Sequence, residues 1–116
     1  MNTAIDIKKR EVEGVLVFEF SGELDETNAD RTFTAIVSEI GDFTDKKLVF
    51  NLAGLKYLNS KSIGYIADVF GNIEENNGRM ALSNLGEDVR DTLELVGITS
   101  IVPVFDSEDE AVVSMR

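Results

Sequence analysis

Short apolar runs alternate along the chain with segments in which apolar residues recur every three or four positions. The runs at residues 15–20, 48–52 and 80–83 have the length and character of strands that are buried on both faces. Residues 5–13 alternate only in part and carry three consecutive basic residues, as edge strands often do. A last strand is expected at residues 98–105, at an edge or strand end, because this stretch holds the only proline.

Four segments show the spacing of amphipathic helices. They are expected to begin after Asn28, after Ser60, at residues 84–86 and after Ser107, where capping residues stand. Gly41, Gly78 and Gly97 are expected to end the first three helices. The residues expected on the buried faces are Ala29, Phe33, Ile36, Val37 and Ile40; Ile63, Ile66, Ala67, Phe70 and Ile73; Leu85, Val89, Leu93 and Val96; and Ala111, Val112 and Met115.

The order of these elements predicts the fold class. An opening hairpin that turns at Gly14 is followed by alternating helices and strands, and strands joined by helices pair in parallel through right-handed crossovers. The expected fold is therefore α/β, with a mixed sheet of about five strands and four helices layered on it. The chain shows no repeat and no linker, so residues 1–116 are expected to form a single domain.

Composition argues against an enzyme. The chain of 116 residues contains neither His nor Cys, so general acid–base catalysis near neutral pH and zinc binding lose their commonest side chains. Neither a glycine-rich nucleotide-binding pattern nor the spacing of a calcium loop occurs in the sequence. We expect no catalytic residue, no metal and no cofactor.

Charge narrows the class of partner. The formal net charge of −11 argues against direct binding to nucleic acid or to an anionic membrane surface, and favours a basic protein surface. Residues 1–6 lack the basic and apolar regions of a signal peptide, and no apolar stretch approaches the length of a membrane span. A cytoplasmic protein without membrane insertion is expected.

The start of the second expected helix carries the candidate chemistry. Asn59, Ser60 and Ser62 precede or open an apolar helix that follows the central strand. Helix capping alone explains such residues. A hydroxyl at this place is also suited to phosphorylation, because backbone N–H groups and the helix dipole tolerate an anion there, while a docking partner would meet new negative charge.

These residues resemble the STAS-domain family of anti-sigma factor antagonists. The family motif, a strand ending in Asp or Asn and Leu, a spacer and then Asp-Ser-Ser-Gly-Leu-Gly, is similar to Asn51-Leu52 followed by residues 59–64. Residues 21–25 resemble the family's Gly-x-Leu-Asp turn, and residues 77–80 and 95–98 extend the resemblance over nearly the whole chain. The chain differs from the motif in having Asn59 for Asp, Ser62 for Gly and Lys61 for a small residue.

The resemblance implies a site and a function. Ser60 matches the serine that the partner kinase phosphorylates, with Ser62 as the alternative acceptor. The partner-binding residues would be Asp25, Asn59, Ser60, Lys61 and Ser62. Asp25 has the alternative role of a turn residue, and Lys61 that of a solvated charge or a counter-charge for the phosphate.

The implied function is partner switching. The chain would bind an anti-sigma factor that has serine kinase activity and so free a sigma factor; phosphorylation would end the binding, and a phosphatase would reverse it. The alternative is a STAS subunit of a larger assembly, such as a stressosome or a lipid-transport complex, in which the same surface is a permanent contact.

Overall fold

The computed structural model describes residues 4–116. Residues 1–3, which belong to the segment expected not to be a signal peptide, lie outside the described residues. A five-stranded sheet has the order β1-β2-β3-β4-β5, with β1 antiparallel to β2 and the other pairs parallel. The strands are β1 (Ile5–Val12), β2 (Val15–Leu24), β3 (Lys47–Leu58), β4 (Arg79–Ser83) and β5 (Val104–Phe105). The helices are α1 (Ala29–Ile40), α2 (Ser60–Glu75), α3 (Glu87–Leu95), the 3-10 turn η1 (Ile98–Ser100) and α4 (Glu108–Val113). The predicted fold class is confirmed.

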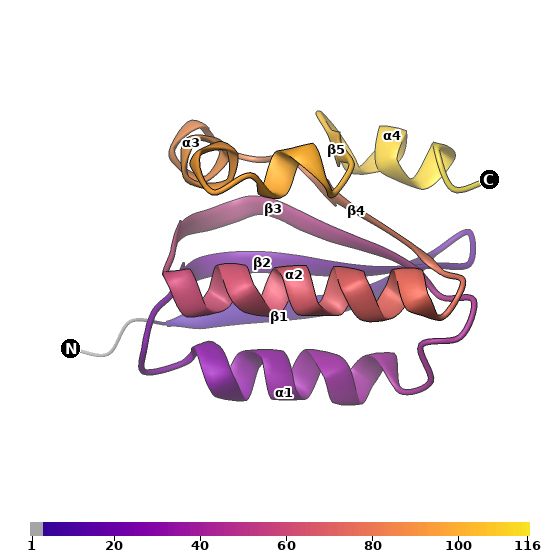
Figure 1. The fold of residues 1–116 in the computed structure, drawn as a ribbon, viewed down its shortest axis with the longest axis horizontal. Helices are drawn as coiled ribbons and strands as arrows, with labels where there is room; N and C mark the ends of the chain where they lie inside the picture. The colour runs from indigo at the N-terminus through magenta and orange to yellow at the C-terminus, as the bar shows by residue number, and fades with distance from the viewer. Residues whose placement is uncertain (1–3) are drawn as a thin grey trace.

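The two faces of the sheet bury different side chains. Helices α1 and α2 run beside one another along one face (Figure 1), where Phe18 and Phe50 of the central strands enter the larger apolar cluster. Alternate residues of the same two strands point to the opposite face of the sheet. There Val17 of β2 and Val49 of β3 pack with Met115, which follows α4. This alternation is the two-residue period of strands that are covered on both sides.

Strands β2 and β3 are longer than predicted. The apolar runs predicted strands at residues 15–20 and 48–52, whereas β2 continues to Leu24 and β3 to Leu58, so both predicted strand ends were wrong. The two strands pair as far as Leu24 and Leu58, with register shifts on the way. At such irregularities the alternation of apolar and polar residues along a strand is interrupted, so the sequence pattern no longer indicates that the strand continues.

The predicted helices are present, but some of their core positions differ. Val37 is 42% exposed and Val96 is 54% exposed, so both were wrongly placed in the core. In α2 the buried face includes Val69, which the pattern missed, while Ala67 and Phe70 are only half-buried. Val37, Ala67 and Phe70 each directly follow a buried residue, whereas Val96 lies just beyond the end of α3, so the errors lie at the borders of the apolar faces.

The last strand is much shorter than expected. Residues 98–105 form η1 and an irregular stretch, and only Val104–Phe105 pair with β4. Gly97 has a φ of +84°, which reverses the chain after α3 and starts η1 instead of a strand. Pro103 immediately precedes the strand, as predicted from its missing N–H.

A cluster of charged and polar side chains connects the start of α4 to the sheet. Arg10 Nη2 on β1 lies 2.6 Å from Glu108 Oε1 and 2.9 Å from Glu19 Oε2. Asn51 Nδ2 donates to the same Glu108 oxygen at 3.0 Å. These contacts hold the pKa of Glu108 below its ordinary value, chiefly through the hydrogen bond from Arg10, despite partial burial, which acts in the opposite direction.

Glu108→Gln should lower stability in a pH-dependent way. Because the folded-state pKa of Glu108 is depressed, its contribution is present above the ordinary value of 4.5 and is lost as pH falls through the folded-state pKa. Arg10 is partly exposed, so we expect a loss of only about 1 kcal/mol at neutral pH. Urea denaturation of both proteins over a pH series from neutral into the acidic range should show the difference in free energy of unfolding shrink as the pH falls below 4.5. A difference that stays constant with pH would contradict this role.

Alanine substitutions at two glycines should change the stability of the protein in opposite directions. A Cβ at Gly54 of β3 would lie 2.5 Å from Ser21 Oγ and 2.8 Å from Phe20 O, so Gly54→Ala should destabilise the protein by roughly 1–3 kcal/mol. A Cβ at Gly71 of α2 meets nothing within 4 Å. Gly71→Ala should therefore stabilise the helix by about 0.5–1 kcal/mol. Thermal unfolding of the two variants should shift in opposite directions; equal shifts would contradict the close β2–β3 approach.

Candidate functional site

The candidate site lies where β2 and β3 end. Leu24 and Leu58 are paired at the carboxyl ends of these parallel strands, so Asp25 and Asn59 follow at the same edge of the sheet. The backbone N–H of Asn59 donates to Leu24 O at 3.0 Å and joins the two segments directly. Figure 1 shows α2 starting from this edge. The structure thus brings together two segments that are 34 positions apart in the sequence.

Asn59 is the N-cap of α2. Its Oδ1 accepts from the backbone N–H of Ser62 at 3.0 Å and from the Ser62 hydroxyl at 2.7 Å. The Ser62 side chain is fully buried, with 0% exposure. Capping is therefore the work of Asn59 and not of Ser60, and the Ser62 hydroxyl serves the cap. A buried hydroxyl is unavailable to a kinase or a partner, so Ser62 is not retained as acceptor or contact residue.

Ser60 is the first residue of α2 and is exposed. Within residues 4–116 its hydroxyl makes no hydrogen bond, and the backbone N–H groups of Ser60 and Lys61 have no acceptor. Such N–H groups belong to the donors that a helix start leaves unsatisfied, and they carry the positive end of the helix dipole. Ser60 therefore presents a free hydroxyl at a place that favours negative charge.

An exposed cluster beside Ser60 links α2 to α1. Lys61 Nζ lies 2.9 Å from Asp30 Oδ1, and the Tyr65 hydroxyl donates to the same carboxylate. The pKa of Asp30 is held below its ordinary value, chiefly by the hydrogen bond from Tyr65 and next by that from Lys61. Asp30 in turn raises the pKa values of Lys61 and Tyr65. Lys61 is thus already paired with Asp30, a contact that the sequence analysis did not predict. The four-residue spacing of Lys61 and Tyr65 does place these two side chains on one side of a helix.

Asp25 shapes the other segment of the site. Its Oδ1 accepts from the backbone N–H of Thr27 at 2.8 Å and from the Thr27 hydroxyl at 2.6 Å. Asn28 precedes α1, as predicted, but its side chain bonds backward: Oδ1 accepts from the N–H of Asp25 at 3.0 Å and Nδ2 donates to Glu23 O at 3.0 Å. The turn role expected as an alternative for Asp25 is present in the structure.

Neither a cluster of metal ligands nor a membrane-crossing helix occurs in the described part of the chain. Among residues 4–116 there is no group of three or more carboxylates that could hold a metal ion. In the same range no helix has both the length and the apolar character that crossing a bilayer requires. Two open grooves of about 370 and 350 Å³ lie away from Ser60, and neither is lined by Asp25, Asn59 or Lys61.

Comparisons with known proteins agree with this geometry. A family model described as STAS domain matches residues 6–111. The anti-sigma F factor antagonist of Paenibacillus polymyxa is 27% identical over 116 residues, which are 100% of this chain and 97% of the relative. The crystal structure of an anti-sigma factor antagonist from Mycobacterium paratuberculosis has a TM-score of 0.85 at 23% identity, covering 97% of this chain and 95% of that one. Bacillus SpoIIAA, solved in its phosphorylated form, has a TM-score of 0.66 at 19% identity, covering 97% and 100%.

The sheet, the shared edge and the helix start that bears Ser60 define a STAS fold. The chain belongs to the STAS domain family. Within that family it is similar to anti-sigma factor antagonists, as the resemblance of its motifs predicted.

Asn59→Ala should destabilise the protein by about 1–3 kcal/mol, because α2 loses its cap and the buried Ser62 hydroxyl loses its acceptor. Asn59→Asp keeps an acceptor oxygen at the positive end of the helix and should stay within about 0.5 kcal/mol of the parent. Urea denaturation followed by circular dichroism measures both. Asn72→Ala, at an exposed position of α2, is the matched control. If Asn59→Ala unfolds no more readily than this control, the cap is not the stabilising contact.

Proposed function

We propose that this protein is an anti-sigma factor antagonist that works by partner switching. It binds an anti-sigma factor with serine kinase activity through the Asp25 segment and the start of α2. Phosphorylation of Ser60 ends the binding, and a phosphatase restores it. The observation that carries the proposal is the exposed, unbonded Ser60 hydroxyl at the first residue of α2. The similarity to anti-sigma factor antagonists supports it.

The neighbouring contacts suit a switch that acts on the partner and leaves the fold intact. A phosphoryl group on Ser60 adds about 1.5–2 negative charges at a helix start, where unsatisfied N–H groups favour an anion. The cap made by Asn59 and Ser62 does not involve the Ser60 side chain, so the modification breaks no bond of the cap. A partner lying over Ser60 would have to desolvate the new anion, which is unfavourable unless the partner pairs it.

The charge and composition of the chain support a regulatory role without catalysis. The formal net charge is −11, and the sequence has neither His nor Cys. The partner is therefore expected to offer a basic surface, and the kinase activity is assigned to the partner. Such a pathway operates in the cytoplasm, where we place the protein.

Incubation with the cognate anti-sigma factor kinase and ATP should label Ser60, as phosphosite mapping would show. Ser60→Ala should abolish the label and keep the binding, because the lost hydroxyl makes no hydrogen bond within the described residues. Ser60→Asp should weaken binding at least about tenfold in a titration, because it places a charge where the partner docks. The measurement is isothermal calorimetry with the isolated kinase.

Ser38→Asp provides the matched control, since Ser38 is an exposed serine on α1 outside the site. It adds the same charge elsewhere and should bind as the parent does. A label on another residue, or a Ser60→Asp protein that binds as tightly as the Ser38→Asp protein, would overturn the switch.

A further inference from the structure

The end of α3 and the segment that leads to β5 expose large apolar side chains. Leu95 is 87% exposed, Val96 is 54% exposed and Ile101 is 55% exposed, while Ile98 between them is anchored at 5% exposure. Singly exposed apolar residues are ordinary, but a cluster within seven positions of a small domain marks a contact surface. Leu95, Val96 and Ile101 are called the α3–η1 patch below.

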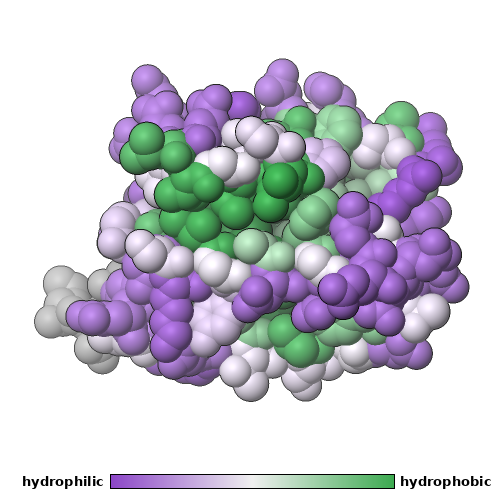
Figure 2. All heavy atoms as spheres, viewed as in Figure 1, coloured by the Kyte–Doolittle hydropathy of each residue, from purple (hydrophilic) through white to green (hydrophobic). Residues whose placement is uncertain are grey.

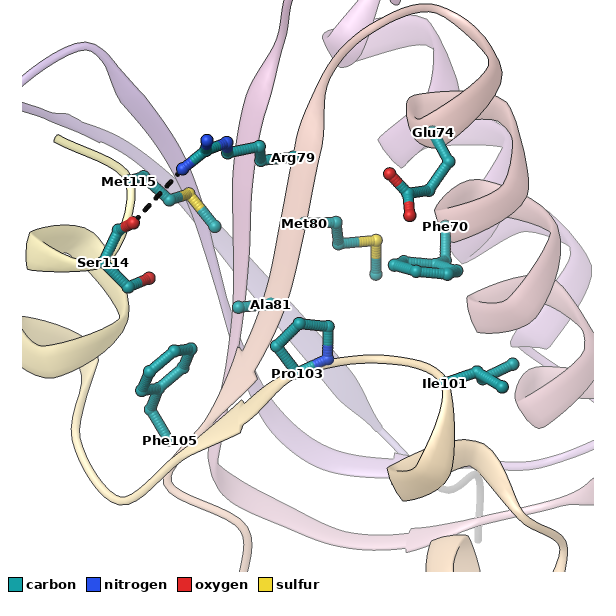
Figure 3. A pocket seen from close by; sticks show the side chains of 10 residues that line it. All are labelled: Phe70, Glu74, Arg79, Met80, Ala81, Ile101, Pro103, Phe105, Ser114 and Met115. Carbon is teal, nitrogen blue, oxygen red and sulfur yellow. Dashed lines mark hydrogen bonds between the residues drawn. The ribbon is translucent and has the colours of Figure 1, made fainter.

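The patch continues into a hollow beside α2. Figure 2 shows apolar side chains gathered between α2 and the α3–η1 segment. Ile101 lines the groove of about 370 Å³, together with Phe70 of α2 and Pro103. In Figure 3 Ile101 and Phe70 lie at the same side of this groove. The protein thus offers exposed apolar side chains next to a depression that an apolar side chain of a partner can enter.

Helix α3, which ends with Leu95, lies towards the end of the sheet at which α2 and Ser60 start (Figure 1), while Ile101 lines the groove along the later turns of α2. One partner that docks on Ser60 can therefore extend over the α3–η1 patch. Exposed apolar surface at the centre of an interface, surrounded by charged residues, is the usual arrangement in protein complexes.

The charges around the patch select the kind of partner. Asp91 lies one helical turn before Leu95, Glu94 lies next to it, and Glu87 and Asp88 open the same helix; all four are exposed. The single basic residue of α3, Arg90, lies 3.8 Å from Asp106. A second copy of this chain would place these carboxylates against one another, whereas a partner with basic residues around an apolar side chain would match them.

We infer that the α3–η1 patch is a second part of the docking surface for the anti-sigma factor, and that it receives an apolar side chain of the partner flanked by basic residues. The inference rests on the proposed function, since it assigns the same partner. The patch contributes binding affinity whether or not Ser60 is phosphorylated, and phosphorylation of Ser60 controls when the binding ends. It also allows the kinase to hold the chain while the phosphoryl group is transferred.

The test compares two identical substitutions at equally exposed valines. Val96→Ser removes apolar surface from the patch, and Val113→Ser does so on α4, where Val113 is 50% exposed. Calorimetric titration with the anti-sigma factor should give a Kd for Val96→Ser, and for Leu95→Ser, that is at least about tenfold above the parent value. Val113→Ser should bind as the parent does. Because these side chains are exposed, thermal unfolding should change little in all three variants.

The rate of Ser60 phosphorylation gives a second measure of the contribution of the patch. At kinase concentrations below saturation, Ser60 phosphorylation of Leu95→Ser should slow by the same factor as its affinity falls, with the rate at saturation unchanged. Parent-like affinity and rate in both patch variants would overturn the inference and leave the proposed function standing. If the parent itself fails to bind the anti-sigma factor, both are wrong. Sedimentation that shows a parent dimer, lost in Leu95→Ser, would assign the patch to a second copy and likewise overturn the inference.

Discussion

The pairing of β2 with β3 up to Leu24 and Leu58 is the constraint on which the candidate site depends. Parallel strands end at the same edge of a sheet, so whatever follows each strand is brought together there. In this chain the segment of Asp25 follows one strand and α2 follows the other. The hydrogen bond from the Asn59 N–H to Leu24 O extends that pairing by one residue into the site. The register of two buried strands therefore decides where Ser60 stands.

Two serines separated by one residue have opposite environments at this edge. Ser62 is buried and bonded to Asn59, while Ser60 is exposed. Successive residues of a helix point in different directions, and a capped helix start has only one orientation relative to the sheet. The cap thus separates a hydroxyl that stabilises the fold from a hydroxyl that is available for chemistry. A site built in this way can be modified without a change in the packing beneath it.

The acidic surface and the exposed apolar residues fit one kind of contact. The acidic side chains of α3 would repel those of a second copy and would suit a basic partner. Leu95 and its neighbours supply apolar area that such a partner can cover. The ion pair between Asp30 and Lys61 joins one charge of each sign beside the start of α2, where the proposed modification of Ser60 would add negative charge. A new charge at Ser60 is then a large local change, even on a protein whose total charge is already strongly negative.

The sequence by itself determined the fold class, the family resemblance, the cap before α2 and the position of Ser60 at a helix start. These features depend on local spacing and on residue types with strong preferences, as at Asn59 and Gly97. The ends of β2 and β3, the exposure of Val96 and the pairing of Lys61 with Asp30 were decided by tertiary structure. Strand length depends on a partner strand, the edge of an apolar stripe depends on what covers it, and an ion pair between two helices depends on how they pack. None of these neighbours is adjacent in the sequence, which is why local pattern could not reveal them.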